Sequence, residues 1–181
     1  TDPILWQGPQ QLLGEEIKVY MNDSTIDWAH IINQALAVEM NDSIHYNQVT
    51  GKEMKAFFRN GEMHQVDVDG NVLCIYYPVE EGDTTLMMMD YTESSHLRMV
   101  LKDRKLERGA FIGHTTGVVY PMDQIPADRL RLDAFAWFDY VRPRSKEDIF
   151  EWRGKGADAV LRKSDRKPIG SARDLNIKRK K

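Results

Sequence analysis

The chain has 181 residues, of which 41% are hydrophobic, with a single cysteine and a net charge of −3. This length suits one domain with a buried core, no apolar run reaches the roughly 18 residues of a membrane-spanning helix, and one cysteine excludes an internal disulfide framework. Residues 153–181 hold 11 Lys/Arg against 3 Asp/Glu, which leaves a net charge of −11 on residues 1–152 and disfavours nucleic-acid binding by that acidic part.

The chain contains three copies of one unit, and a repeat is the strongest signal that a sequence carries about its fold. Residues 14–26 align without gaps with residues 51–63, and residues 54–63 align with residues 97–106. The second alignment continues until Tyr77-Pro78 meets Tyr120-Pro121. Residues 1–10 resemble the end of an earlier copy. The repeat predicts a stack of similar layers.

Each copy predicts three short strands. The first strand shows the apolar and polar alternation of a half-buried strand, and it ends in a turn at residues 22–24, 59–61 and 102–104. Asn60-Gly61 is a strong hairpin signal because both residues accept positive φ. Return strands are expected over 26–31, 63–68 and 106–111, bends at Asn33, Gly70 and Gly113, and third strands over 35–38, 72–77 and 118–120.

One face of the first strands is predicted to be apolar and to point inward. Its members are Ile17, Val19 and Met21, then Met54, Ala56 and Phe58, then Leu97, Met99 and Leu101. Lys18, Lys55 and Arg98 occupy outward positions between them. A register slip of one residue would exchange the two faces. A groove lined by such residues suits acyl chains, because each buried CH₂ contributes roughly 0.8 kcal/mol.

The remaining segments depart from the repeat. Residues 79–91 predict one or two further strands, and residues 124–130 a turn or short helix. Residues 134–141 are densely aromatic, and Ser145 with Asp148 fits a capping box for a helix reaching about Arg153. We therefore divide the chain into a β-strand repeat domain (1–121), an aromatic and helical segment that caps the open end of the stack (122–153), and a flexible basic tail (154–181).

No catalytic motif, cofactor loop or metal-ligand spacing is recognisable. The five histidines are scattered, and a calcium loop around Asp67 to Asn71 would need acids where Gln65 and Tyr76 stand. Cys74 lies in an apolar run and is expected to be a small core residue. We therefore expect a non-enzymatic protein without a cofactor or metal. The basic tail is either an arm for anionic partners or a solvated terminus.

The repeats resemble the OstA-like (LptA-type) family of lipopolysaccharide-transport proteins. The resemblance is best seen where residues 51–61 are followed by Val68-Asp69-Gly70-Asn71-Val72. With Ile75-Tyr76-Tyr77-Pro78 and the aromatic run from Ala136 to Tyr140, the chain looks like the members from Bacteroidetes in particular. The third copy departs from the pattern, with His114-Thr115 following Gly113.

The resemblance implies a V-shaped β-jellyroll made of stacked antiparallel strands, with lipid A tails inside. It implies a periplasmic, cell-envelope location, although no secretory leader opens this chain and composition leaves the compartment open. The implied partners are lipopolysaccharide and other such modules, or further copies of this chain, joined through edge strands; no nucleic acid is expected. The nine inward residues would then line the lipid groove. The alternative is a structural or adhesive β-solenoid with a closed core and no lipid ligand.

Overall fold

The computed structural model describes residues 3–79, 85–145 and 147–150, so the predicted basic tail lies outside the described residues. Within these residues nine strands form one open antiparallel sheet in the order β1-β2-β4-β5-β6-β7-β8, with β3 paired to β4 and β9 paired to β7. The strands are β1 (Ile4–Gln7), β2 (Gln10–Leu13), β3 (Glu16–Asn22), β4 (Thr25–Met40), β5 (Tyr46–Arg59), β6 (Glu62–Tyr76), β7 (Met88–Lys102), β8 (Lys105–Ile112) and β9 (Thr116–Pro121). The expectation of a mainly-β, antiparallel protein is confirmed.

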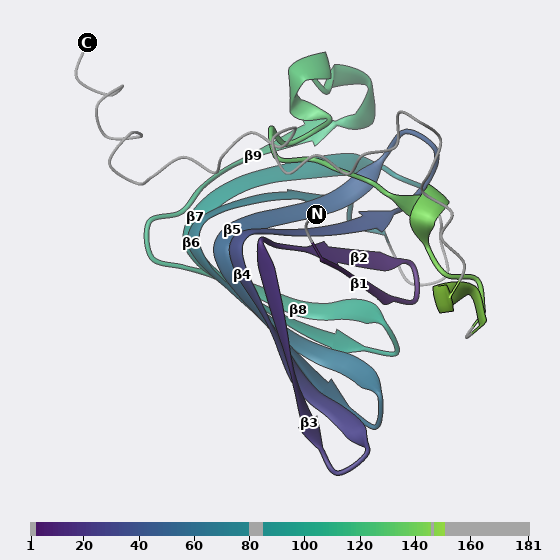
Figure 1. Cartoon of the computed structure of the whole chain (residues 1–181). Coiled ribbons are helices and arrows are strands. Elements are labelled where there is room, and N and C mark those ends of the chain that lie inside the picture. Colours follow the sequence, from purple (N-terminus) through teal and green to yellow (C-terminus); the bar gives the residue numbers. More distant parts are fainter. Residues whose placement is uncertain (1–2, 80–84, 146, 151–181) are drawn as a thin grey trace.

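The sheet bends across its middle into two arms (Figure 1). Strands β4 to β7 have 14 to 16 residues each and run through the bend from one arm into the other. The upper arm contains β1, β2, β9 and the halves of β4 to β7 beside them, and the lower arm contains β3, β8 and the other halves. The inner faces of both arms contribute to one apolar cluster.

Bulges at equivalent positions of the repeat produce this bend. Asn33 and Gln34 of β4 stand opposite the single residue Lys52 of β5, and β6 repeats the arrangement with Gly70 and Asn71. All four residues of the two bulges have positive φ, between 51° and 81°. Gly and Asn adopt such values at low cost. An extra residue bends its strand and increases the local twist, which confirms the predicted bends at Asn33 and Gly70.

The three sequence copies correspond to the hairpins β3-β4, β5-β6 and β7-β8 of the lower arm. Their predicted turns are confirmed, with positive φ at Asp23, at Asn60 and Gly61, and at Asp103 and Arg104. The third strands expected over 35–38 and 72–77 are continuations of β4 and β6 through the bend. Only in the last copy does the strand stop, at Gly113 with φ of 92°, so that β9 is separate.

Small residues occupy the inside of the bend because the arms meet there. A Cβ added at Gly14 would lie 2.4 Å from Cγ2 of Ile31, and one added at Gly51 would lie 2.4 Å from Cγ1 of Val68. Glycine at the start of the first two copies therefore permits close packing of the arms. The third copy has Ser94 at this position, and its hydroxyl donates to carbonyl oxygens of β7 and β8.

The pairing register places all nine predicted inward residues on one face of the sheet. One row crosses the lower arm through Ile17, Ile31, Met54, Val68, Leu97 and Phe111. A second row crosses it through Val19, Ala29, Ala56, Val66, Met99 and Gly109. A third row contains Met21 beside Ile26, Phe58 beside Met63, and Leu101 beside Leu106. Alternation thus identified a shared face correctly.

The aromatic segment covers a face of the sheet and not its open end, so that prediction was wrong. Residues 135–138 pack on Leu13, Leu36 and Tyr46, and Leu132 packs on Ile75 of the outer face of the upper arm. The face offers these large rings an extended apolar surface, whereas a sheet end offers only a strand edge.

This segment has no α-helix among its described residues, contrary to the expected helical cap. It contains the short 3-10 helices η1 (Met122–Gln124), η2 (Ala127–Arg129), η3 (Asp139–Val141) and η4 (Glu147–Phe150). The expected capping contact does form, because the Ser145 hydroxyl accepts a hydrogen bond from the Asp148 N–H at 3.4 Å. The predicted continuation to Arg153 lies outside the described residues.

Two fully buried glutamines hold the aromatic segment on the sheet. Gln48 of β5 donates from Nε2 to the Leu130 carbonyl and accepts at Oε1 from the Leu132 N–H, both at 2.9 Å. Gln11 of β2 makes the same pair of bonds with the Ala136 carbonyl and the Phe138 N–H, both at 2.8 Å. Each side-chain amide therefore satisfies one acceptor and one donor of a backbone that has no strand partner.

Replacement of Gly51 by alanine tests the packing at the bend. The added methyl group would meet the stiff, fully buried Val68 side chain, and overpacking of this kind lowers the free energy of unfolding by about 1–3 kcal/mol. Gly109→Ala is the control, since no atom lies within 4 Å of its added Cβ. Urea denaturation followed by circular dichroism measures both, and equal stability of the two variants would contradict the packing argument.

Replacement of Gln48 by leucine tests the attachment of the aromatic segment. The change leaves the buried Leu132 N–H without its partner, at a cost of about 1–3 kcal/mol, and the Leu130 carbonyl keeps only its bond from Arg131. We expect faster trypsin cleavage at Arg129 and Arg131, which flank the contact in sequence. Gln65→Leu on the lower arm is the control, because within the described residues the Gln65 side chain bonds to Asp67 of its own strand and not to the aromatic segment. Unchanged cleavage in Gln48→Leu would show that the glutamine is dispensable.

Candidate functional site

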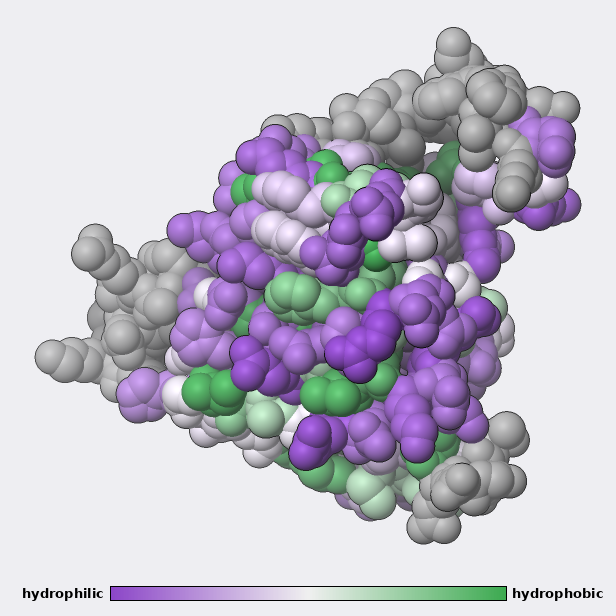
Figure 2. Space-filling view, turned by 90° about the horizontal axis from the view of Figure 1, so that it is seen from below, coloured by the Kyte–Doolittle hydropathy of each residue, from purple (hydrophilic) through white to green (hydrophobic). Residues whose placement is uncertain are grey.

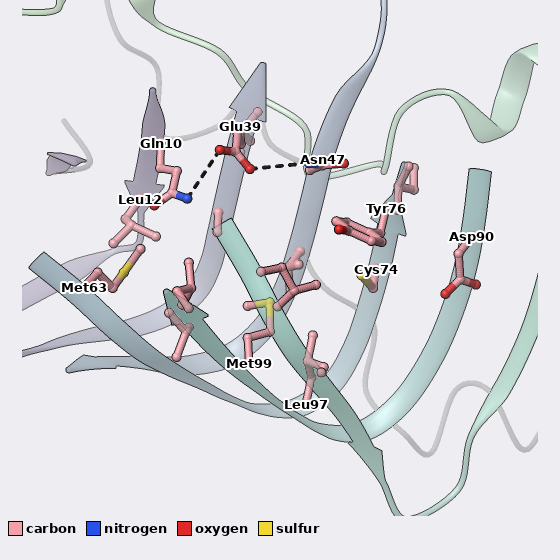
Figure 3. Close-up of a pocket in the computed structure, with 18 of the residues that line it drawn as sticks. Gln10, Leu12, Glu39, Asn47, Met63, Cys74, Tyr76, Asp90, Leu97 and Met99 are labelled. Atoms are coloured by element: carbon pink, nitrogen blue, oxygen red, sulfur yellow. Dashed lines mark hydrogen bonds between the residues drawn. The ribbon is translucent and has the colours of Figure 1, made fainter. Parts of the chain in front are cut away.

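The two arms enclose a groove of about 130 Å³ (Figure 3). Its apolar lining includes Leu12, Val49, Met63, Leu97, Met99 and Phe111, which come from strands of both arms. Apolar cavities of roughly 150 Å³ hold one benzene molecule. The enclosed space therefore fits a segment of an alkyl chain, and the remainder of a longer ligand would extend out between the diverging arms.

The nine predicted groove residues occupy three different environments. Leu97, Met99 and Leu101 line the groove directly. Met54, Ala56 and Phe58 are buried in the apolar cluster beside it, and Ile17 packs against that cluster. Val19 and Met21 are 43% and 57% exposed on the edge strand β3. The structure therefore brings seven of the nine together, and strand β3 lies too far toward the sheet edge for its last two to be covered.

Five polar side chains form a rim along the upper arm, near the strand ends that lie away from the bend. This polar rim consists of Gln10, Glu39, Asn47, Tyr76 and Asp90 (Figure 3). Glu39 accepts hydrogen bonds from Nε2 of Gln10 at 3.4 Å and from Nδ2 of Asn47 at 3.3 Å. The Thr92 hydroxyl donates to Asp90 at 2.7 Å. The groove is thus apolar in its depth and polar at its mouth.

Sequence reasoning missed the polar rim because the bend changes which residues point inward. On β5 the even positions Met54 and Ala56 face the interior below the bend, whereas the odd positions Asn47 and Val49 do so above it. At the bend, one residue of β5 stands opposite the two bulge residues of β4. The inward positions of β5 therefore change from odd to even numbers there. The bends at Asn33 and Gly70 were the available signal, but their effect on the neighbouring strands requires the pairing register.

The hairpin β1-β2 connects the two arms at the mouth of the groove. Gln7 donates from Nε2 to the carbonyl of Gly61, at the turn of β5-β6, at 3.3 Å. The neighbouring Gly8 lies beside the Arg104 side chain at the turn of β7-β8, where Arg104 also pairs with Glu62 at 3.2 Å. On the side away from the bend, the arms are therefore joined by side-chain contacts of one hairpin turn.

The outer face of the lower arm carries charged side chains at the predicted outward positions, beside a row of stacked aromatic rings from Tyr20, Trp28 and Phe57. Arg98 forms two hydrogen bonds with Asp67, at 2.8 and 3.0 Å, and His96 pairs with Asp69. The side chains of Asp67 and Asp69, the two acids of the segment compared with a calcium loop, are therefore engaged with Arg98 and His96. No group of three or more His, Cys, Asp or Glu side chains suited to a metal ion occurs in residues 3–79, 85–145 and 147–150. Seen from below, apolar side chains are exposed in bands between hydrophilic ones (Figure 2).

Comparison with known proteins gives no match to a family model, to a curated protein or to a solved structure. Among the described residues, no helix has the length and apolar character to cross a membrane. The function is therefore inferred from the groove.

The reactivity of Cys74 reports on how closed the groove wall is. Cys74 lines the groove yet is only 5% exposed, and burial, with a smaller contribution from the Asp90 charge, raises the pKa of its thiol to about 12. Since only the thiolate reacts and an unperturbed thiol has a pKa near 8.5, we expect alkylation by iodoacetamide at pH 8 to be at least about a hundred times slower in the folded protein than in urea. Similar rates would mean that the wall opens to solvent.

Proposed function

We propose that the chain binds an amphipathic lipid with its alkyl chains in the groove and its polar head at the rim, and that it carries this lipid between envelope components. The observation that supports the proposal is the groove, whose apolar depth and polar rim match the two ends of such a ligand. Binding sites for small molecules typically combine an apolar lining with a few placed polar groups.

The expected affinity suits a carrier. Burial of about six methylene groups would contribute roughly 5 kcal/mol, equivalent to a Kd near 0.2 mM before the costs of binding. A ligand held in this way is released readily, and several chains or several modules would be needed for tight retention. The groove therefore supports transfer of a lipid better than permanent storage.

Lipopolysaccharide is the ligand that the resemblance implies, and its transport across the periplasm to the outer membrane is the specific role that we propose. The two arms of the bent sheet would then be those of a V-shaped β-jellyroll. Joining of modules through their edges is supported by exposed apolar residues at both ends of the sheet, namely Val19 and Met21 on β3, Ile112 on β8, and Val118 and Val119 on β9. Such edges pair readily with further strands.

Photocrosslinking with a groove-filling variant tests the proposal. Benzoylphenylalanine at Leu101, in the groove, is expected to label lipopolysaccharide, and the same probe at the exposed, outward-facing Ala110 is not. Gly109 lies on the inner face with open space around it, so the ring of Gly109→Phe would occupy the groove. We expect the crosslinking yield of the probe at Leu101 to fall at least about fivefold in this variant.

Ala110→Phe is the matched control, because it adds the same ring to the opposite face of β8. Circular dichroism verifies that both variants are folded. Equal labelling from Leu101 and Ala110, or full labelling in a folded Gly109→Phe variant, would reject lipid binding and favour the alternative of a structural module with a closed core.

A further inference from the structure

The lining of the groove carries negative charge without a compensating positive charge. Among the described residues that line the groove, Glu39 and Asp90 are the charged ones, and none is Lys, Arg or His. Resting on the proposed lipid binding, we propose that the groove selects amphiphiles whose head carries an ammonium group next to the alkyl chain, and that it discriminates against heads with a phosphate at that position.

The two carboxylates lie on β4 and β7, and Gln10 on β2 continues the polar rim beyond Glu39. With two strands between them, they are about 14 Å apart across the inner face. Within the described part of the chain, no Lys, Arg or His nitrogen lies within 4.0 Å of either carboxylate. A head group anywhere along the rim is therefore within one or two strand spacings of an uncompensated negative charge.

The carboxylates of the polar rim can accept more hydrogen bonds than they receive from the protein. A carboxylate accepts up to about four hydrogen bonds, whereas Glu39 receives two long ones, at 3.3 and 3.4 Å, and Asp90 receives one, from Thr92. The Asn47 amide is engaged with neighbouring oxygens and with the Tyr77 N–H. An ammonium group supplies three donors and a positive charge, which complement these acceptors.

Partial burial strengthens this preference. Glu39, Tyr76 and Asp90 are all half-buried, so their electrostatic interactions are screened less than those of fully exposed groups. Burial and the nearby Glu39 charge both raise the pKa of Tyr76, so its hydroxyl stays neutral and Glu39 and Asp90 set the charge of the rim. A phosphate would face like charges at the rim, and such repulsion is an effective source of specificity.

Three amphiphiles with the same dodecyl chain show how much the head contributes to binding: dodecylammonium, dodecyl phosphate and the neutral dodecyl maltoside. Isothermal titration calorimetry below their micelle concentrations gives each affinity for the full chain. We expect dodecylammonium to bind at least about ten times more tightly than dodecyl phosphate, a difference of roughly 1.4 kcal/mol. In the double variant E39Q/D90N the ratio of these two affinities should fall below about two, and the affinity for dodecyl maltoside should stay unchanged.

The double variant E16Q/E107Q is the control, because it removes the same charge from exposed residues that do not line the groove, and it should retain the ratio. Equal binding of ammonium and phosphate by the unmodified protein would overturn the head-group preference alone, provided that dodecyl maltoside binds and that Gly109→Phe abolishes its binding. If E16Q/E107Q also loses the difference in affinity between dodecylammonium and dodecyl phosphate, that difference comes from the overall charge of the protein, and the inference is overturned. If dodecyl maltoside fails to bind, the proposed lipid binding itself is wrong.

Discussion

A sheet with one continuous apolar face has to cover that face, and this chain does so by bending the sheet onto itself. The bulges at Asn33-Gln34 and Gly70-Asn71 turn the long strands back over their own interior. Glycine at positions 14 and 51 allows the arms to approach at the fold line. The groove, its lining and its mouth all follow from this bend, because each position along a strand has a defined distance from it.

Much of this arrangement could be predicted from sequence, because local signals control it. The turn at Asn60-Gly61 and the bends at Asn33, Gly70 and Gly113 depend on which residues tolerate positive φ. The inward face of the lower arm depends on alternation, which is visible within seven residues. These features need no knowledge of distant contacts, and their recurrence in three copies strengthened each prediction.

The incorrect or missing predictions depend on long-range contacts. The place of the aromatic segment is decided by Gln11 and Gln48, which lie more than 80 residues before the backbone groups that they bind. Their amides look like ordinary polar positions in the sequence. The polar rim was missed for a similar reason. The bulges in β4 and β6 change which alternate residues of β5 and β7 point inward, and this change is visible only in the pairing of the strands. The exposure of Val19 and Met21 follows from the edge position of β3.

The continuity of β4 to β7 through the bend determines how the protein can deform. Four covalent crossings, each tied to its neighbours by ladder hydrogen bonds, make the angle between the arms stiff. The β1-β2 turn is a compliant element by comparison, because it reaches the opposite arm through one side-chain hydrogen bond and the contact with Arg104. With a ligand bound as proposed, the four crossings would set how much the groove holds, and the hairpin turn would set how quickly that ligand is replaced.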